Sequence, residues 1–543
     1  MKNSAMSRRY FLSATALAAL ATGVPSIPAI GRGNNSSLSF WDIAARKKGI
    51  LKLSVWFLAQ DVERLLSKPD NLNKAISWCK AQGATKVYFE AYGRGLYVNR
   101  DVLINAKQKF LKAGLEVQGG LQTVNGPDNF NSPHCFTSKT DQDELQKIFE
   151  YAASLFDEII IDDWFFTNCT DQESIKAREN KSWAEYNSDV MVKMSQERVM
   201  APAHKINPKV KVILKFPQWN EGFQSRGYDV AREPKIFDGI WAGTEAREFD
   251  ENSSAGYEAS YNAYFNMRWI ATFGSLGGGW FDPGGERTKV NTYIEQARHT
   301  VLGEAKEMIL CWYTDTFPTD KFDALRKEMP GLIKLADIVR GKTVKGVHLL
   351  KPGNSDGFED EYVSSFMGSL GIPFAPASTL NEQAPSAFFS IHALKEPGFV
   401  QKLEQLAAKG TPIVVTDGLA KRLNAHPELV KKLAVLPLNG SSRAVLKMTR
   451  EQIKPFRDKL LGPFAMKFDA PNKVELYLFG DHTIAFMNIN NEAVNLTLEL
   501  PKITSVKKTL ILPEESGTAD LSLTKRTLNI RISARTLFVI DYK

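Results

Sequence analysis

The stretch D-E-I-I-I-D-D-W-F-F-T, residues 157–167, decides the fold of this chain. Three consecutive isoleucines are typical of a strand that is buried on both faces, as the strands of parallel sheets are. The run ends abruptly in two carboxylates, Asp162 and Asp163, followed by three aromatic residues. Burying an unpaired carboxylate is costly, so two acids at the carboxyl end of one strand indicate a cleft with a chemical task.

Short apolar runs alternate with amphipathic segments on both sides of this stretch. Strands are expected at 50–57, 86–90, 115–122, 157–161, 209–216, 237–245, 274–281 and 308–313. Helices are expected at 62–81, 102–113, 141–156, 183–205, 256–270, 288–302 and 321–339. This alternation predicts an α/β fold, a (β/α)8 TIM barrel over residues 45–341.

The pattern changes after residue 341. Short apolar runs at 346–350, 371–375, 387–391 and 412–416, with a helix at 397–408, predict a flavodoxin-like α/β domain over residues 342–445. A connecting helix is expected within residues 446–465. Strands at 473–479, 483–489, 494–500, 507–511, 527–532 and 536–542 then predict an antiparallel β-sandwich over residues 466–543.

The first 30 residues have the features of a cleaved export signal. Arg8 and Arg9, with Phe11 and Leu12 after them, precede the small apolar run 13–23. This arrangement resembles a twin-arginine signal, which implies export of a folded protein from a bacterium to the periplasm or the medium. An ordinary secretory signal with two chance arginines is the alternative, and it leads to the same compartment.

The remaining composition excludes several classes of protein. A net charge of +8 over 543 residues, without a cluster of Lys and Arg, gives no support to a nucleic-acid partner. No later window has the roughly 18 uncharged apolar residues of a membrane span. No pair of histidines has ligand spacing, so we expect neither a metal nor another cofactor.

Four cysteines are present, at positions 79, 135, 169 and 311, and their spacing matches no zinc motif. Cys135 and Cys169 both fall in segments expected near the cleft, so one interpretation is a disulfide between loops. Four buried thiols is the interpretation that we favour.

Barrel enzymes carry their reactive groups at the carboxyl ends of the strands, and here those ends are polar and aromatic. The candidate catalytic residues are Asp162, Glu245 and Asp163. The candidate substrate-binding residues are Glu90, Lys215, Trp164, Trp219, Trp241, Trp280, Asp282, Trp312 and Asp315. Acids beside aromatic rings are typical of a sugar site, because a ring face covers the C–H face of a pyranose.

Each candidate also has a structural interpretation. In that interpretation Asp162 and Asp163 only cap the following loop, and Glu245 is the ion-pair partner of Arg247 or Arg94. The D-P-G-G sequence at Asp282 favours a turn. The polar candidates 90, 215 and 315 fit a salt-bridge network equally well, and about half of the tryptophans are expected in the core.

The spacing Asp157-x-x-x-x-Asp162 resembles the fourth strand of clan D α-galactosidases and of α-amylases, where the second acid is the nucleophile. The resemblance implies that Asp162 is the nucleophile and that Glu245, at the end of the sixth strand, is the acid/base. Clan D has a lysine two positions before its nucleophile, and this chain has Ile160 there.

The order of domains is similar to that of trimeric microbial β-galactosidases, whose middle domain helps to assemble the trimer. This likeness implies a homo-oligomer, a dimer or a trimer. Those enzymes have an Asn-Glu pair at the end of the fourth strand, where this chain has Asp162 and Asp163.

Glycoside hydrolysis needs two carboxyl groups, one to attack or stabilise the anomeric centre and one to protonate the leaving oxygen. We therefore expect an exported glycoside hydrolase that acts on an oligosaccharide or glycoside with retention of configuration. The alternative is a non-catalytic periplasmic carbohydrate-binding protein on a barrel scaffold, because the aromatic residues support both functions.

Overall fold

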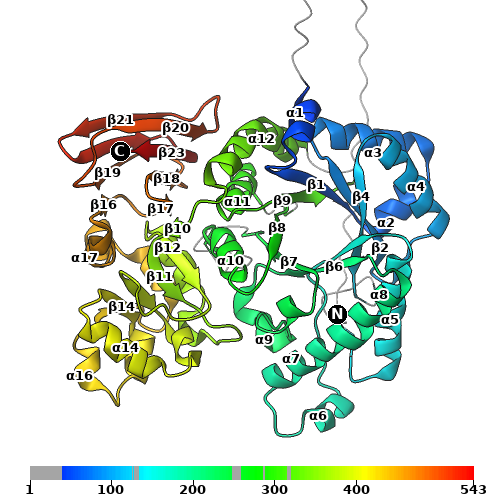
Figure 1. The fold of residues 1–543 in the computed structure, drawn as a ribbon, viewed down its shortest axis with the longest axis horizontal. Coiled ribbons are helices and arrows are strands. Elements are labelled where there is room, and N and C mark those ends of the chain that lie inside the picture. Colours follow the sequence, from blue (N-terminus) through cyan, green and yellow to red (C-terminus); the bar gives the residue numbers. More distant parts are fainter. Residues whose placement is uncertain (1–38, 125, 127–133, 247–258, 285–287, 315–318) are drawn as a thin grey trace, which may run out of the picture. The chain divides into compact units, whose positions relative to one another are not determined.

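A closed parallel barrel forms the first half of the protein in the computed structural model, which describes residues 39–124, 126, 134–246, 259–284, 288–314 and 319–543 (Figure 1). Its strands are β1 (Lys52–Phe57), β2 (Lys86–Gly93), β4 (Glu116–Gln122), β5 (Glu158–Ile161), β6 (Lys211–Phe216), β7 (Gly239–Gly243), β8 (Leu276–Trp280) and β9 (Glu307–Trp312). They pair in this order, and β9 returns to pair with β1, which closes the ring. The predicted (β/α)8 barrel is confirmed.

Helices cover the outside of the barrel. They include α1 (Phe40–Lys47), α3 (Pro69–Ala81), α4 (Arg100–Lys112), α5 (Lys139–Ala153), α6 (Gln172–Arg178), α7 (Trp183–Met194), α8 (Ala201–Ile206), α9 (Phe223–Arg226), α10 (Asn262–Ile270), α11 (Val290–Leu302) and α12 (Thr319–Val339). A two-residue strand, β3 (Leu96–Tyr97), folds back antiparallel on the end of β2.

Two helices that were predicted as continuous are interrupted. The segment 62–81 divides into a π-helical turn (Val62–Leu66) and α3, which begins at Pro69 because proline lacks an N–H and suits the first helical position. The segment 183–205 contains a π-helical stretch, Ser195–Met200, between α7 and α8.

Large side chains fill the barrel interior. They are Trp56, Tyr88, Ile160, Ile213, Trp241, Trp280 and Ile309. Glycines on the neighbouring strands make room for the indoles: a Cβ on Gly120 would lie 2.2 Å from Trp56, and one on Gly278 would lie 2.8 Å from Trp241. The glycine-rich sequence of β8 is therefore a packing requirement of the barrel.

The second region contains a five-stranded parallel sheet. Its strands are β11 (Val347–Leu350), β12 (Phe374–Ala377), β13 (Ala387–Phe389), β14 (Ile413–Thr416) and β15 (Ala434–Leu436), in the order β12-β11-β13-β14-β15. Its helices are α13 (Val363–Ser369), α14 (Phe399–Ala408), α15 (Asp417–Arg422) and α16 (Pro427–Val430). In chain order this sheet reads 2-1-3-4-5. The short strand β15 was not predicted.

The last region consists of two antiparallel sheets whose strands follow α17 (Arg450–Leu461), except for β10, which precedes it. One sheet has the order β10-β17-β18-β23-β20 and the other β16-β19-β22-β21. The strands are β10 (Val344–Lys345), β16 (Lys467–Asp469), β17 (Val474–Phe479), β18 (Thr483–Asn488), β19 (Val494–Glu499), β20 (Val506–Leu512), β21 (Ala519–Thr524), β22 (Thr527–Ile532) and β23 (Thr536–Tyr542). Phe486 and Phe538 of the first sheet share one buried cluster with Leu498 and Leu528 of the second.

Ser39–Lys543 forms one compact unit, so contacts between these regions belong to a single body. Within the described part of the chain, no helix is long and apolar enough to cross a bilayer. The interpretation of all four cysteines as buried thiols was wrong for one pair, because Cys135 and Cys169 form a disulfide, whereas Cys79 is a free buried thiol. The two bridged residues lie in the loops that follow β4 and β5, where the chain brings their Cα atoms to 5.3 Å.

Candidate active site

A single lysine brings the three predicted catalytic acids together. Lys215, on β6, is 1% exposed, and its Nζ lies 2.6 Å from Glu245 Oε1, 2.7 Å from Asp163 Oδ1 and 3.3 Å from Asp162 Oδ1. Burial lowers the pKa of Lys215, but the carboxylates of Asp163, Glu245 and Asp162 outweigh burial, so the pKa is raised. The lysine is therefore a permanent cation at the centre of an acidic site.

The end of β5 explains how two consecutive acids reach the same cation. Successive residues of a strand point to opposite faces. Because β5 ends at Ile161, this alternation does not apply to Asp162 and Asp163. The Asp162 N–H still donates to the carbonyl of Leu121 on β4, at 2.9 Å. Tyr228 donates its hydroxyl hydrogen to the backbone carbonyl of Asp163 and fixes the next peptide.

Glu245 follows β7 and is 1% exposed. Burial raises its pKa to about 8; the charge of Lys215 opposes this rise, and the charges of Asp163 and Asp282 add to it. Its Oε2 is buried and has no hydrogen-bond partner among the described residues. A carboxyl group with one oxygen fixed and the other unengaged, and with a raised pKa, has the properties of a general acid.

The structure tests the alternative ion pair of Glu245 only in part. Arg247 lies outside the described residues, and Arg94 donates instead to Gln122 Oε1, at 3.2 Å. Gln122 in turn donates to Asp162 Oδ2, at 3.4 Å. The cation beside Glu245 is Lys215.

Glu90, within β2, is fully buried and uses both carboxylate oxygens inside the protein. Oε1 accepts the indole N–H of Trp56 at 2.8 Å, and Oε2 accepts the N–H of Ala59 at 2.7 Å. Burial raises the pKa of Glu90 to about 8, although the Ala59 hydrogen bond opposes this rise and the charge of Asp162 adds to it. Glu90 thus anchors Trp56 and the start of the first loop.

Asp282 and Asp315 are the two remaining acidic candidates. Asp282 is 5% exposed, and its N–H donates to Gln296 Oε1 at 3.2 Å. Its effect on the pKa of Glu245 puts it beside the acidic site. Asp315 lies outside the described residues.

The five candidate tryptophans divide into two groups. Trp164 and Trp219 are half-buried and flank Phe166, with ring centroids 6.0 and 6.3 Å from it. The Arg226 guanidinium lies 4.8 Å from the Trp219 ring. These rings form an aromatic wall beside the two aspartates.

Trp241 and Trp280, only 2% and 4% exposed, belong to the second group, in the barrel interior. Lys215 Nζ lies 4.3 Å from the centre of the Trp280 ring, so the ring stabilises the cation by a cation–π interaction. Trp312 is half-buried and packs against the same interior cluster.

Trp56 and Tyr228 are two contributors that sequence reasoning missed. Trp56 packs against Trp280 with centroids 4.7 Å apart, so it supports Lys215 through one further ring. Its place near the end of β1 was a usable signal. Tyr228 lies outside any strand, and no pattern in the sequence marked it.

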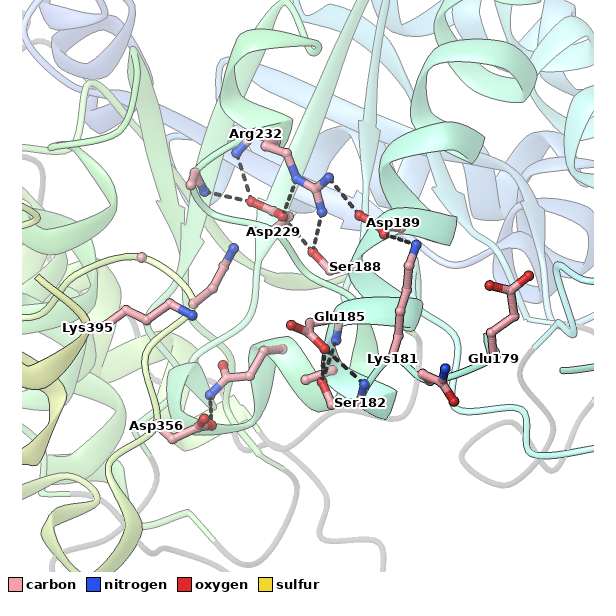
Figure 2. A pocket seen from close by; sticks show the side chains of 16 residues that line it. Glu179, Lys181, Ser182, Glu185, Ser188, Asp189, Asp229, Arg232, Asp356 and Lys395 are labelled. Carbon is pink, nitrogen blue, oxygen red and sulfur yellow. Dashed lines mark hydrogen bonds and ion pairs between the residues drawn. The ribbon is translucent and has the colours of Figure 1, made fainter. Parts of the chain in front are cut away.

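A separate cavity of about 850 Å³ contains none of the candidate residues (Figure 2). Its wall includes Asp229, whose Oδ2 lies 2.6 Å from Arg232 Nε, and Asp189, which pairs with Arg232 and Lys181. These charges neutralise one another.

One group of side chains in the described part of the chain has metal-ligand spacing: Cys135, Cys169 and Asp171. The disulfide consumes both thiols, so this group does not fit a metal ion.

Residues 40–330 match the model of a family described as the catalytic domain of probable glycosyl hydrolases. The uncharacterized protein SSO3021 of Saccharolobus solfataricus is 25% identical over 412 residues, which cover 68% of this chain and 67% of that protein.

The chain is also similar, at low identity, to solved structures. A GH5_18 variant from Streptomyces cattleya, in complex with Manb1-4GlcNAc, is 12% identical with a TM-score of 0.36, over 73% of this chain and 99% of that one. The family 30 subfamily 8 xylanase Xyn30A of Clostridium acetobutylicum is 7% identical with a TM-score of 0.32, over 90% and 96% of the two chains. These scores identify neither substrate nor mechanism. The family match spans more than half of the sequence, and on that ground the chain belongs to the probable glycosyl hydrolases and contains their catalytic domain.

Proposed function

We propose that this protein is a retaining glycoside hydrolase with Asp162 as the nucleophile and Glu245 as the acid/base. The observation that carries the proposal is the position of Lys215 between them. Asp162 Oδ1 lies 3.3 Å and Glu245 Oε1 lies 2.6 Å from the same nitrogen, so these two oxygens are at most 5.9 Å apart. Retaining enzymes need carboxyl groups about 5–5.5 Å apart, and inverting enzymes about 6.5–9.5 Å.

The raised pKa of Glu245 suits the first half-reaction. A carboxyl group with a pKa of about 8 is protonated at neutral pH and can give its proton to the leaving oxygen as Asp162 attacks the anomeric carbon. After the leaving group departs, ionised Glu245 takes a proton from water, and the water releases the sugar from Asp162. Lys215 holds the Asp162 carboxyl group in position, and Asp163 is a second partner of the lysine.

The proposed substrate is a pyranoside, whose C–H face stacks on Trp164 or Trp219, with Asp282 and Asp315 as hydroxyl ligands. The half-exposed aromatic wall beside Asp163 supports this assignment. The spacing Asp157-x-x-x-x-Asp162 favours an α-glycoside of the kind that clan D enzymes cleave.

We extend the proposal to the domain layout and assembly. The strand order 2-1-3-4-5 supports a flavodoxin-like domain at 342–445, and the two sheets with a shared core support a β-sandwich at 466–543. The likeness of this layout to trimeric β-galactosidases favours a homo-oligomer.

We also propose that the protein is exported. The disulfide between Cys135 and Cys169 supports a periplasmic or secreted location, because disulfides persist in oxidising compartments.

A hydrolysis screen tests the proposed function. The protein is incubated with α- and β-linked p-nitrophenyl hexosides and with natural oligosaccharides, and the first product is observed by ¹H NMR before mutarotation. We expect hydrolysis of one glycoside class, with the product in the anomeric configuration of the substrate, and no turnover by Asp162→Asn. A first product of opposite configuration contradicts retention, and full activity of Asp162→Asn contradicts the nucleophile.

A further inference from the structure

A loop of the barrel occupies the edge of the second region's sheet where α/β folds of this order bind ligands. In a 2-1-3-4-5 sheet the strand order reverses between the first and third strands, here β11 and β13, and ligands bind outside their carboxyl ends. Lys351 directly follows β11, and His392 lies three residues after β13. Both side chains contact Glu221, which belongs to the loop after β6.

Glu221 is held from three sides. Its Oε1 lies 2.9 Å from Lys351 Nζ and accepts the N–H of Tyr362 at 3.1 Å, and its Oε2 lies 3.0 Å from His392 Nε2. The side chains of Glu221, Lys351 and His392 are at most 5% exposed. Burial opposes the ionisation of Glu221, but His392 and Lys351 outweigh it and lower its pKa. A fully desolvated ion cluster with these contacts fixes its members in one geometry.

The same lysine also holds the neighbouring residue of the loop. Lys351 Nζ donates to Asn220 Oδ1 at 2.5 Å and lies 4.8 Å from the Trp269 ring. Asn220 donates to Asn262 Oδ1 at 3.0 Å, and Ser365 of α13 donates to the same oxygen.

This loop leads directly to the acidic site. The loop begins at residue 217, directly after Phe216 and two residues after Lys215, and it carries Trp219. At Gly243, an ideal Cβ would lie 2.7 Å from the N of Gln218 and 2.6 Å from Glu245 Oε2, so the loop backbone and the carboxyl group flank the same glycine. A shift of the loop by one ångström therefore changes the surroundings of Glu245.

We propose that Lys351 and His392 are positioning residues of the active site, and that the second region acts as a clamp on the loop 217–222. Its ligand-binding edge takes this loop of the same chain in place of a diffusible ligand. The clamp sets the position of Trp219 and of the backbone beside Glu245, and so governs substrate binding. This inference rests on the proposed function for its kinetic consequence, but the clamp itself is measured without a substrate.

The test uses the full-length protein and the substitution Lys351→Met, which keeps most of the side-chain length and removes the charge. Hydrogen–deuterium exchange of peptides that cover 217–226 should rise, while peptides from β5 and β6 stay protected. With the best p-nitrophenyl glycoside, KM should rise on the order of tenfold, with a smaller loss in kcat, because misplacement of a binding group weakens the bound complex. Arg422→Met is the matched control: it breaks the 2.6 Å pair with Glu359 in the same region, away from the loop, and should leave both quantities unchanged.

Lys351→Met removes one cation from the buried Glu221, which keeps His392 and the Tyr362 N–H, and this loss can prevent folding. The double variant Glu221→Gln with Lys351→Met removes both charges and takes its place in that case, with the same expected results. Unchanged exchange of 217–226 overturns the clamp. Increased exchange with unchanged KM and kcat overturns the positioning role. If the wild type hydrolyses no glycoside, the proposed function fails, and exchange alone then decides whether Lys351 holds the loop.

Discussion

At the scale of single residues, the site depends on how burial and neighbouring charges act on four titratable groups. These are Lys215, Glu245, Asp162 and Asp163. Lys215 is charged because the acidic groups around it outweigh its burial, and Glu245 keeps its proton because burial and two further acids outweigh the lysine. One environment thus favours the ionised form of one group and the neutral form of another, which acid/base catalysis requires.

The first prediction concerns the pH dependence of catalysis. The general acid must be protonated, so kcat/KM should fall as pH rises through about 8, where Glu245 loses its proton. Glu245→Gln should abolish this limb and reduce turnover of poor leaving groups by about 10²–10⁴-fold. Initial rates between pH 5 and 10 measure both effects.

Glu233→Gln is the control for that experiment. The pKa of Glu233 is also raised to about 8 by burial, but its carboxylate bonds to Ser195 and to the N–H of Asp229, outside the acidic site. The alkaline limb should persist in this variant. If Glu233→Gln removes the limb and Glu245→Gln keeps it, the assignment of the acid is wrong.

Sequence reasoning identified which residues to bring together, but not how they meet. Asp162, Asp163 and Glu245 were found because they follow a buried strand, and Lys215 because it lies near the carboxyl end of one. The position of Lys215 between the three acids was not predictable, because it depends on how β5, β6 and β7 are positioned relative to one another along the barrel axis. Trp241 is the opposite case. Its strand was predicted correctly, but its side chain lies in the barrel interior and not in the cleft, because neighbouring residues of a strand point to opposite faces.

At the scale of elements, β7 offers a sharp test of how backbone and carboxyl group fit together. Gly243→Ala should lower kcat/KM on the order of 100-fold, because its Cβ would lie 2.6 Å from Glu245 Oε2 and 2.7 Å from the N of Gln218. Gly239→Ala, in the same strand, would meet only Ile213 at 3.5 Å and should keep its activity. Equal activities of the two variants would contradict the packing described for this strand.

The loops after β4 and β5 give a second prediction at this scale. Replacing Cys135 and Cys169 by Ser removes a bridge with a sequence separation of 34, and should lower the free energy of unfolding by about 3–4 kcal/mol. Denaturant melts with and without dithiothreitol measure the effect. The double variant should be insensitive to the reductant; a wild type that is equally insensitive would contradict the disulfide.

Strands were easier to predict than helices because their apolar runs are short and bounded. All eight barrel strands were found, with ends within a few residues of those observed. The interruptions at 62–66 and 195–200 were missed, since apolar periodicity continues through a π-helical turn. Strand β21 was missed although its apolar residues alternate with polar ones; most of the strand is exposed.

At the scale of the whole molecule, three buried carboxyl groups impose a pH dependence on stability. The pKa values of Glu90, Glu233 and Glu245 are raised to about 8 from an ordinary value near 4.5. A raised folded-state pKa contributes stability that is present below pH 4.5 and is lost as pH rises through 8. The Tm should therefore be higher at pH 5 than at pH 8.5.

Glu233→Gln measures the contribution of one of these carboxyl groups to the pH dependence of stability. The amide keeps the contacts of the carboxyl group without a charge, so the variant should gain roughly 2–4 kcal/mol relative to the wild type at pH 9 and little at pH 5. Thermal melts across this range provide the comparison. A Tm that rises from pH 5 to pH 8.5 in the wild type would contradict the account.

The barrel was predictable from sequence because eight repeats of one pattern specify it redundantly. The arrangement of the second region against the barrel was not, since it depends on single contacts such as Lys351 with Glu221. The disulfide was left open for the same reason: spacing alone does not tell which loops meet.

The central claim is that Asp162 attacks the anomeric carbon while Glu245 supplies the proton. Azide rescue tests it most directly, with Asp162→Ala and Glu245→Ala assayed on the best aryl glycoside. We predict that azide restores turnover of Asp162→Ala and yields a glycosyl azide of inverted configuration, whereas Glu245→Ala yields one of retained configuration. The reverse pattern, or wild-type turnover by Asp162→Ala without azide, would contradict the mechanism.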